Sequence, residues 1–304
     1  MGNRRLGNKR LEAVLDNLLN HASLNGLNGS PFSIKDPDRY YLEEYFALRP
    51  ALVTALSDNL ANSDATHSTN TTQLNVREVA NKNFKLNNDT GASNDDVTFD
   101  TTQAGLLFDP DATDNRQLAI LPHTATNQTA WGNIKFGTEN QVQWECVMRT
   151  GASIADACIF SGLKLTATPV IATDDDAIYF LYDSSDDSGT LTTNTTWHVV
   201  YSIGGTDYIT DLGITVAAAT NYRLGITIDS DRKAAVWVNG VQYSLAATAG
   251  STGGTTVSPA KGTLLSLALT DDIDLLPTWG VVNRSGTARA HVLSNMKISR
   301  ILFE

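Results

Sequence analysis

The chain has 304 residues, of which 41% are hydrophobic and 18% charged, and its formal net charge is −11. This composition supports a folded core, and the acidic balance argues against a protein that coats nucleic acid, which needs a basic surface. No apolar run approaches the roughly 20 residues that span a bilayer, so no membrane association is expected. The basic start is not followed by the apolar stretch of a secretory signal, and we therefore expect no export by that route.

Two cysteines, Cys146 and Cys158, are too few for a disulfide framework and cannot alone close a four-ligand zinc site. We expect both to be reduced core residues. The chain is otherwise rich in Thr, Asn, Asp, Ala and Gly and poor in Glu and Lys. That mixture is typical of strands joined by turns.

Residues 1–60 predict a short helical arm. Apolar residues recur at helical spacing from about Leu6 to Asn20, and two Asn-Gly pairs with a proline in residues 25–31 indicate a hinge. Asp36-Pro37 is a suitable start for a second short helix that ends near Pro50. Helices this short are marginal in isolation, so each needs a surface to pack on, either its own domain or a partner.

The arm carries two kinds of candidate contact residue. The basic residues at its start would meet an acidic partner surface, and the aromatic residues of the second helix would anchor in an apolar groove. These candidates are Arg4, Arg5, Lys9, Arg10, Tyr40, Tyr41, Tyr45 and Phe46. Polar, aperiodic sequence follows, which we interpret as a linker over 61–75 that leads to a main domain over 76–304.

The main domain is predicted to be all-β, because its apolar residues alternate with a period of two and turn signals separate the runs. The turn at 229–233 and the Asn239-Gly240 pair each indicate a hairpin. So many strands without a long helix favour an antiparallel jelly-roll sandwich over a parallel sheet, which would need crossover helices. The main strands are expected at 141–148, 158–165, 177–182, 197–203, 212–216, 222–228, 234–238, 241–244, 278–283 and 295–303.

The successive runs at 197–202, 210–216, 222–229 and 236–240, followed by a terminal strand at 292–303, resemble the concanavalin A-like lectin and glucanase superfamily, which includes laminin-G-like jelly rolls. The resemblance covers roughly residues 140–304. It implies a jelly roll of the kind that binds sugars, and calcium is a cofactor that this superfamily often carries.

The opening run, MGNRRLGNKRLE, together with NGLNGSPF at residues 25–32, is similar to structural proteins of tailed phages. This resemblance implies a non-enzymatic virion component, assembled in the host cytoplasm. We expect a homo-oligomeric capsid decoration protein whose partners are other virion proteins, the major capsid protein first among them.

The sequence lacks the signatures of catalysis. Glycosidases need two carboxyl groups about 5 to 9.5 Å apart, whereas Glu139 and Glu145, if they shared one strand, would lie about 20 Å apart. The glucanase pattern E-x-D-x-x-E is absent, as are the G-x-S-x-G, P-loop and H-E-x-x-H motifs. Asp229 and Asp231 fall in a predicted turn, and His198 is expected on a sheet surface. We therefore expect no enzyme.

Three acidic clusters could supply oxygen ligands for calcium, at 109–114, 174–176 and 183–187. The first offers Asp109, Asp111 and Asp114 as candidate ligands. Candidate loop aromatics for stacking on sugar rings are Trp131 and Tyr208. Two hypotheses follow: a virion structural protein held by its N-terminal arm, and a carbohydrate-binding module, such as a tail or fibre adhesin, that recognises host-surface glycans.

Overall fold

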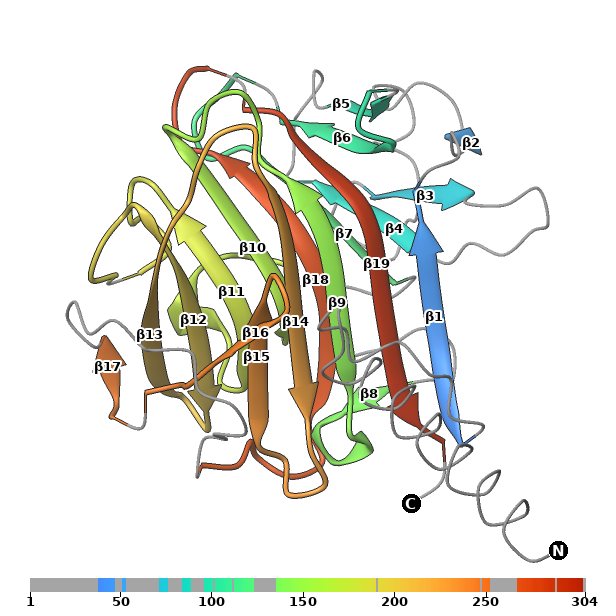
Figure 1. Cartoon of the computed structure of the whole chain (residues 1–304), viewed down its shortest axis with the longest axis vertical. Helices are drawn as coiled ribbons and strands as arrows, with labels where there is room; N and C mark the ends of the chain where they lie inside the picture. The colour runs from blue at the N-terminus through green and yellow to red at the C-terminus, as the bar shows by residue number, and fades with distance from the viewer. Residues whose placement is uncertain are drawn as a thin grey trace, which may run out of the picture.

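The computed structural model describes residues 38–46, 51–52, 71–75, 84–88, 96–100, 102–110, 112–122, 135–189, 191–246, 248–251, 267–287 and 289–302. These residues form two β-sheets packed face to face, with β1, β9, β14 and β19 in one layer and β10, β11, β12 and β18 in the other (Figure 1). The antiparallel jelly-roll sandwich expected from the sequence is confirmed.

Sheet A is the eight-stranded sheet, ordered β16-β15-β14-β9-β19-β6-β5, with β1 also paired to β19. The long strand β19 pairs with β9 along one edge, while its other edge is shared by β6 at residues 291–293 and by β1 at residues 295–301. Its strands are β1 (Arg39–Tyr45), β5 (Asp96–Asp100), β6 (Gly105–Asp109), β9 (Gln143–Arg149), β14 (Asn221–Ile228), β15 (Ala234–Val238), β16 (Val241–Tyr243) and β19 (His291–Ile301).

Sheet B has eleven strands, ordered β17-β13-β12-β11-β10-β18-β7-β4-β3-β2, with β8 paired to β18. Its pairings are antiparallel except for the short parallel contact of β13 with β17. Its strands are β2 (Ala51–Leu52), β3 (Thr71–Asn75), β4 (Phe84–Asn88), β7 (Gln117–Pro122), β8 (Phe136–Gly137), β10 (Ala157–Lys164), β11 (Ala177–Asp183), β12 (Thr196–Ile203), β13 (Thr206–Thr215), β17 (Gly250–Ser251) and β18 (Asp274–Asn283). Two short 3-10 helices, η1 (Thr138–Asn140) and η2 (Ile171–Thr173), lie in the connections.

The main core fills the space between the sheets. Alternate residues of each strand point into it, such as Trp144, Cys146 and Met148 on β9. Both cysteines are free and buried, as expected, and burial raises the pKa of each thiol well above its ordinary value. They are therefore inert core residues.

Both predicted hairpin turns are confirmed. The Asp229 carboxylate accepts the backbone N–H groups of Asp231 and Lys233, at 2.8 and 2.9 Å, which closes the turn between β14 and β15. Asn239 and Gly240 have φ of 51° and 81°, the left-handed pair that a tight turn between β15 and β16 requires.

The prediction of a second helix in the arm was wrong. Residues 39–45 form strand β1, which pairs in register with β19, and Phe46 is buried with its ring 5.7 Å from that of Phe84. The run YYLEEYF has no strict alternation of apolar and polar residues that would mark a strand, and pairing with the free edge of β19 selects the extended form. These residues therefore belong to the sandwich.

The expected linker over 61–75 also contains a strand, because residues 71–75 form β3. The first predicted helix, the hinge at 25–31 and the rest of the linker lie outside the described residues. Within the described part of the chain, no helix is long and apolar enough to cross a membrane.

Candidate functional site

The outer face of sheet B is covered by the chain itself. A second apolar cluster lies there, formed by outward residues of β7, β10, β11, β12, β13 and β18. Ile171 of η2 and Leu191 of the connection before β12 pack onto these strands. Because two connections seal this face, it is built like a second core.

The outer face of sheet A has a different composition. The strand register places Trp237, Gly225, Glu145, Lys297 and Glu43 in one row across β15, β14, β9, β19 and β1. In Figure 1 the outer face of these strands is turned toward the viewer, and no described segment crosses it. The face therefore presents a polar and aromatic surface on a hydrogen-bonded sheet.

Glu145 is the centre of the charges on this face. Its carboxylate forms an ion pair with Arg223, whose Nε lies 3.1 Å away, and lies 3.7 Å from Lys297 Nζ. The Glu145 side chain is only 2% exposed, whereas those of Arg223 and Lys297 are 24% and 14% exposed. Lys297 Nζ also lies 5.2 Å from the centre of the Tyr45 ring. A buried carboxylate thus holds two cationic side chains that are each partly exposed to solvent.

A second polar network lies two residues further along the strands. Arg39 donates to Ser299 Oγ at 3.2 Å, and Ser299 Oγ donates to Gln143 Oε1 at 3.1 Å. This chain of contacts joins β1, β19 and β9. It fixes hydrogen-bonding groups on a surface that does not depend on a loop for its shape.

Gly225 leaves the position between Trp237 and Glu145 without a side chain. A Cβ placed there would lie 3.8 Å from Trp237 Cβ and 3.9 Å from Trp144 O, so nothing crowds the position. Trp237 is partly exposed beside it. Gly225 is itself buried, so the accessible part of the row is the partly exposed indole with the hydrogen-bonding side chains near it. An indole in such surroundings suits a flat ligand with an apolar face and polar edges.

The expectation about Glu139 and Glu145 needs a correction. Glu139 lies in η1 and not on β9, so the two residues do not share a strand. Glu145 is held between two cations. Its carboxylate oxygens are engaged by Arg223 and Lys297, and no second carboxylate shares its strand at catalytic distance.

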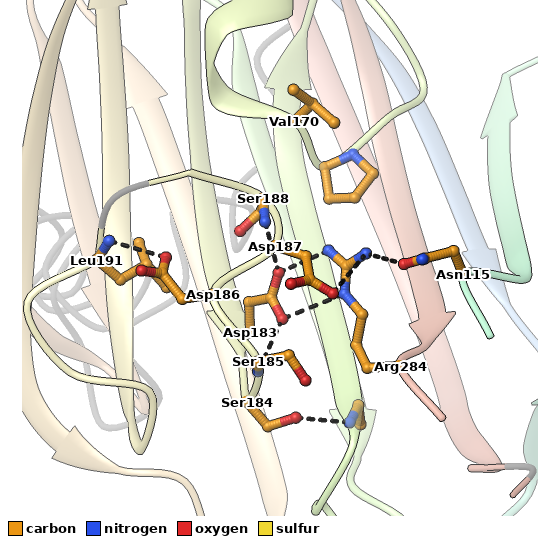
Figure 2. Close-up of polar contacts among 12 residues, drawn as sticks. Asn115, Val170, Asp183, Ser184, Ser185, Asp186, Asp187, Ser188, Leu191 and Arg284 are labelled. Carbon is orange, nitrogen blue, oxygen red and sulfur yellow. Dashed lines mark hydrogen bonds and ion pairs between the residues drawn. The ribbon is translucent and has the colours of Figure 1, made fainter. Parts of the chain in front are cut away.

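The acidic cluster at 183–187 is organised by an arginine. Arg284 Nε and Nη2 donate to the two oxygens of Asp183, at 3.2 and 2.6 Å (Figure 2). The same carboxylate accepts the backbone N–H groups of Ser185 and Ser188. Asp183 is fully buried, and its oxygens are occupied by these donors.

Arg284 extends this cluster to a neighbouring turn. Its Nη1 donates to Asn115 Oδ1 at 2.6 Å and lies 3.9 Å from Asp187, as Figure 2 shows. Asp186 instead accepts the Leu191 N–H at 2.8 Å. The Arg284 guanidinium is the cation of this cluster, and its contacts hold three connections together at one end of the sandwich.

The cluster at 174–176 is tied to the sheet in a similar way. Asp174 forms an ion pair with Lys164, and both side chains are fully buried. Lys164 Nζ lies 3.5 Å from the centre of the Tyr179 ring. Burial lowers the pKa of Lys164, although Asp174 opposes that shift. Asp176 accepts the Thr270 N–H at 3.0 Å.

The cluster at 109–114 is only partly described. Asp109 lies on β6, Asp114 is exposed in a turn, and Asp111 lies outside the described residues. No group of three or more metal-ligating side chains occurs among the residues that the structure describes. Calcium binding at Asp109, Asp111 and Asp114 stays a prediction.

Other predicted residues are placed as follows. Tyr208 lies on β13 and packs against the main core, so its expected loop position was wrong, and Trp131 lies outside the described residues. His198 is buried under the connection before β12, with Nε2 3.2 Å from Thr192 Oγ1, and its expected surface position was also wrong.

The residues proposed to anchor the arm divide into two groups. Phe46 lies in the core of its own sandwich and Tyr40 packs against that core, so neither is an exposed anchor. Burial raises the pKa of Tyr40 to about 12. Tyr41 and Tyr45 lie on the outer face of sheet A. The four basic residues Arg4, Arg5, Lys9 and Arg10 lie outside the described part of the chain.

Sequence reasoning missed the face formed by Trp237, Arg223, Glu145 and Lys297. The alternation of apolar residues that identified the inward positions of these strands also identifies these residues as the outward ones. Which strands lie side by side, and hence which outward residues meet, could not be derived from alternation alone.

No protein-family model and no curated protein matches the chain. Among solved structures, a protein of unknown function from Shewanella oneidensis MR-1 is 8% identical over 86% of each chain, with a TM-score of 0.49. Peanut lectin, solved with a 9-residue peptide, is 9% identical over 78% of this chain and 99% of its own, with a TM-score of 0.45. A Bacillus licheniformis β-glucanase is 11% identical over 72% and 92%, with a TM-score of 0.39. Likenesses of this degree assign neither an activity nor a ligand.

Proposed function

We propose that this protein is a non-enzymatic carbohydrate-binding protein that uses the outer face of sheet A. The observation that carries the proposal is the row formed by Trp237, Gly225 and Glu145, with Arg223 and Lys297 on either side of the carboxylate. It supplies an aromatic ring for the apolar face of a sugar and fixed donors and acceptors for its hydroxyl groups.

The same row supports binding without hydrolysis. Glycoside hydrolysis needs one carboxyl group to donate a proton and a second to act as nucleophile or base. Glu145 is engaged by two cations, and the neighbouring acidic residue of the row, Glu43, lies across β19 beside Lys297. Glu145 is therefore an acceptor for Arg223 and Lys297, and the partly exposed Glu43 is the carboxylate of the row that a ligand can reach.

Titration of the full chain with a panel of neutral and acidic oligosaccharides tests this proposal, with tryptophan fluorescence and calorimetry as readouts. Trp237→Ala should abolish binding and Trp237→Phe should preserve most of it, because a phenyl ring still stacks. Val170→Ala is the matched control, since Val170 is an exposed apolar residue in a connection outside sheet A. Binding that survives Trp237→Ala, or no binding to any member of the panel, overturns the proposal.

The virion role remains a prediction from the opening sequence, with the glycan-binding face displayed outward from a capsid. It predicts that a chain lacking residues 1–37 folds but does not join particles, because the basic residues at 4–10 would be lost. Full incorporation of that truncated chain would contradict it. Particle composition measured by mass spectrometry distinguishes the outcomes.

A further inference from the structure

On six of the eight strands of sheet A, the outer face carries a net charge opposite in sign to that of the whole chain. Considering β16, β15, β14, β9, β19 and β1, the outward positions carry four cations and two carboxylates. The complete sequence has a formal charge of −11. The cations are Arg39, Arg149, Arg223 and Lys297, and the carboxylates are Glu43 and Glu145.

The carboxylates are confined to the middle of this surface. Glu43 and Glu145 lie in the same row, one on each side of Lys297, so this row holds two anions around one cation. Beyond the row, Arg223 and then Arg149 follow toward one end of the strands, and Arg39 lies toward the other. On these six strands, both ends therefore carry positive charge alone.

The register gives the spacing of the cations along the strands. Arg223 lies beside Val147 and Lys297 beside Glu145, while Arg39 pairs with Ile301. At about 3.3 Å per residue, successive cations from Arg149 to Arg39 are offset by about 7, 7 and 13 Å along the strand direction. A track of this length spans several sugar units.

We propose that this face binds an anionic polysaccharide that carries carboxylate groups on its sugar rings. The guanidinium groups of Arg149 and Arg223 match the two oxygens of a carboxylate, and Trp237 receives a sugar ring in the neighbouring row. This inference rests on the proposed function and adds the chemical class of the ligand.

The charge pattern also argues against denser polyanions. Double-stranded nucleic acid carries one charge per about 1.7 Å, which a face with a surplus of two cations on an acidic protein does not neutralise. A uronate polymer carries fewer charges per unit length, and its hydroxyl groups use the partly exposed acceptors at Gln143 and Glu43. Asp100 of β5 and Asp109 of β6 lie outward on the same sheet, on the far side of β19 from Arg149 and Arg223, and limit the track at that corner.

The experiment compares polygalacturonate with its fully methyl-esterified form, which has the same sugar backbone without charge. The full chain should bind polygalacturonate at least about tenfold more tightly than the ester, because the charge-assisted hydrogen bonds are lost with the carboxylates. Raising the ionic strength should narrow this difference. Polyglutamate, a carboxylate polymer without sugar rings, should bind weakly.

Arg149→Gln and Lys233→Gln provide a matched pair, since each removes one positive charge. Arg149 lies on the track, whereas Lys233 lies in the turn after β14 and contacts Asp231 at 3.2 Å. Arg149→Gln should weaken polygalacturonate binding about tenfold and leave the ester unaffected, while Lys233→Gln should change neither. Circular dichroism and melting temperature confirm that both variants are folded.

The outcomes separate this inference from the proposed function. Equal affinity for the polymer and its ester, both sensitive to Trp237→Ala, overturns the charge inference and keeps glycan binding. Equal affinity for polyglutamate and polygalacturonate overturns both, because the ligand would then be any polyanion. No binding to polygalacturonate overturns the inference, and the neutral members of the panel then decide the proposed function.

Discussion

The two outer faces of the sandwich put charged side chains to different uses. On sheet B, Lys164 and Asp174 are fully buried beneath a connection, and Asp183 is fully buried against Arg284. On sheet A, Arg223 and Lys297 are partly exposed around Glu145. A charge that is sealed from water must have its partner inside the protein, whereas one that reaches water can exchange its partner for a ligand.

This difference explains why the acidic clusters that look most like metal sites are structural. The clusters at 174–176 and 183–187 each obtain a cation from the chain, from Lys164 and from Arg284. Their role is to hold connections against the outer face of sheet B. The groups proposed to bind a ligand lie instead on regular strands, where hydrogen bonding between neighbours fixes their positions.

The largest expected effect comes from breaking the buried pair on sheet B. Asp174→Ala should destabilise the protein by about 3 to 5 kcal/mol, because it leaves the Lys164 ammonium buried without its anion. Urea denaturation followed by fluorescence measures the change. The surface pair of Lys135 and Asp274, 2.6 Å apart with Lys135 59% exposed, provides the control. Asp274→Ala should cost about 1 kcal/mol or less.

A double variant tests the cause of that effect. Lys164→Met with Asp174→Ala should recover most of the lost stability, since it removes the unpaired charge and keeps the apolar surroundings. If the double variant is as unstable as Asp174→Ala alone, the loss arises from packing of the connection and not from the buried charge.

The fold could be predicted from the sequence because each sheet has one face in the common core. Alternation in 222–228 and the Asn239-Gly240 turn are local signals, and the structure confirms both. The error at residues 39–45 has a physical cause: YYLEEYF lacks the alternation that marks a strand, and only the open edge of a strand about 250 residues later selects the extended form.

The candidate site could be predicted only in part. Burial of His198 was missed because its covering segment, which contains Thr192, is polar and gives no packing signal. Glu145 was considered only as a catalytic carboxylate, since Arg223 and Lys297 are distant in sequence and become its neighbours through strand pairing. Local patterns predict which residues point outward, but the register determines which of them meet.

A second prediction concerns the pH dependence of folding stability, which we expect to depend on a buried histidine. His291 accepts the Gly151 N–H at Nδ1 and is fully buried, and burial lowers its pKa from 6.5 to about 4. The unfolded chain therefore binds a proton between pH 6.5 and 4 that the folded chain does not. Stability should fall by about 3 kcal/mol as the pH drops through this interval.

His291→Asn separates this residue from other titrating groups. The Asn oxygen can accept the Gly151 N–H but takes up no proton in this range. The variant should lose about 3 kcal/mol less stability than the parent between pH 6.5 and 4, as measured by urea denaturation at several pH values. Identical pH profiles for the two proteins would show that His291 does not control the acid response.

The smallest expected effect on stability comes from removing a carboxylate charge on sheet A, as Asp174→Ala does on sheet B. Glu145→Gln removes the anion shared by Arg223 and Lys297, yet both cations are already in contact with water and can be hydrated in place. The amide keeps an acceptor for Arg223. We therefore expect a loss of about 1 to 2 kcal/mol in the free energy of unfolding, smaller than the loss for Asp174→Ala.

Because Glu145→Gln also removes one negative charge from the track, affinity for polygalacturonate should rise while stability falls slightly. A loss as large as that at Asp174, with no change in affinity, would show that Glu145 serves the sheet as a structural ion pair and that the two faces do not differ.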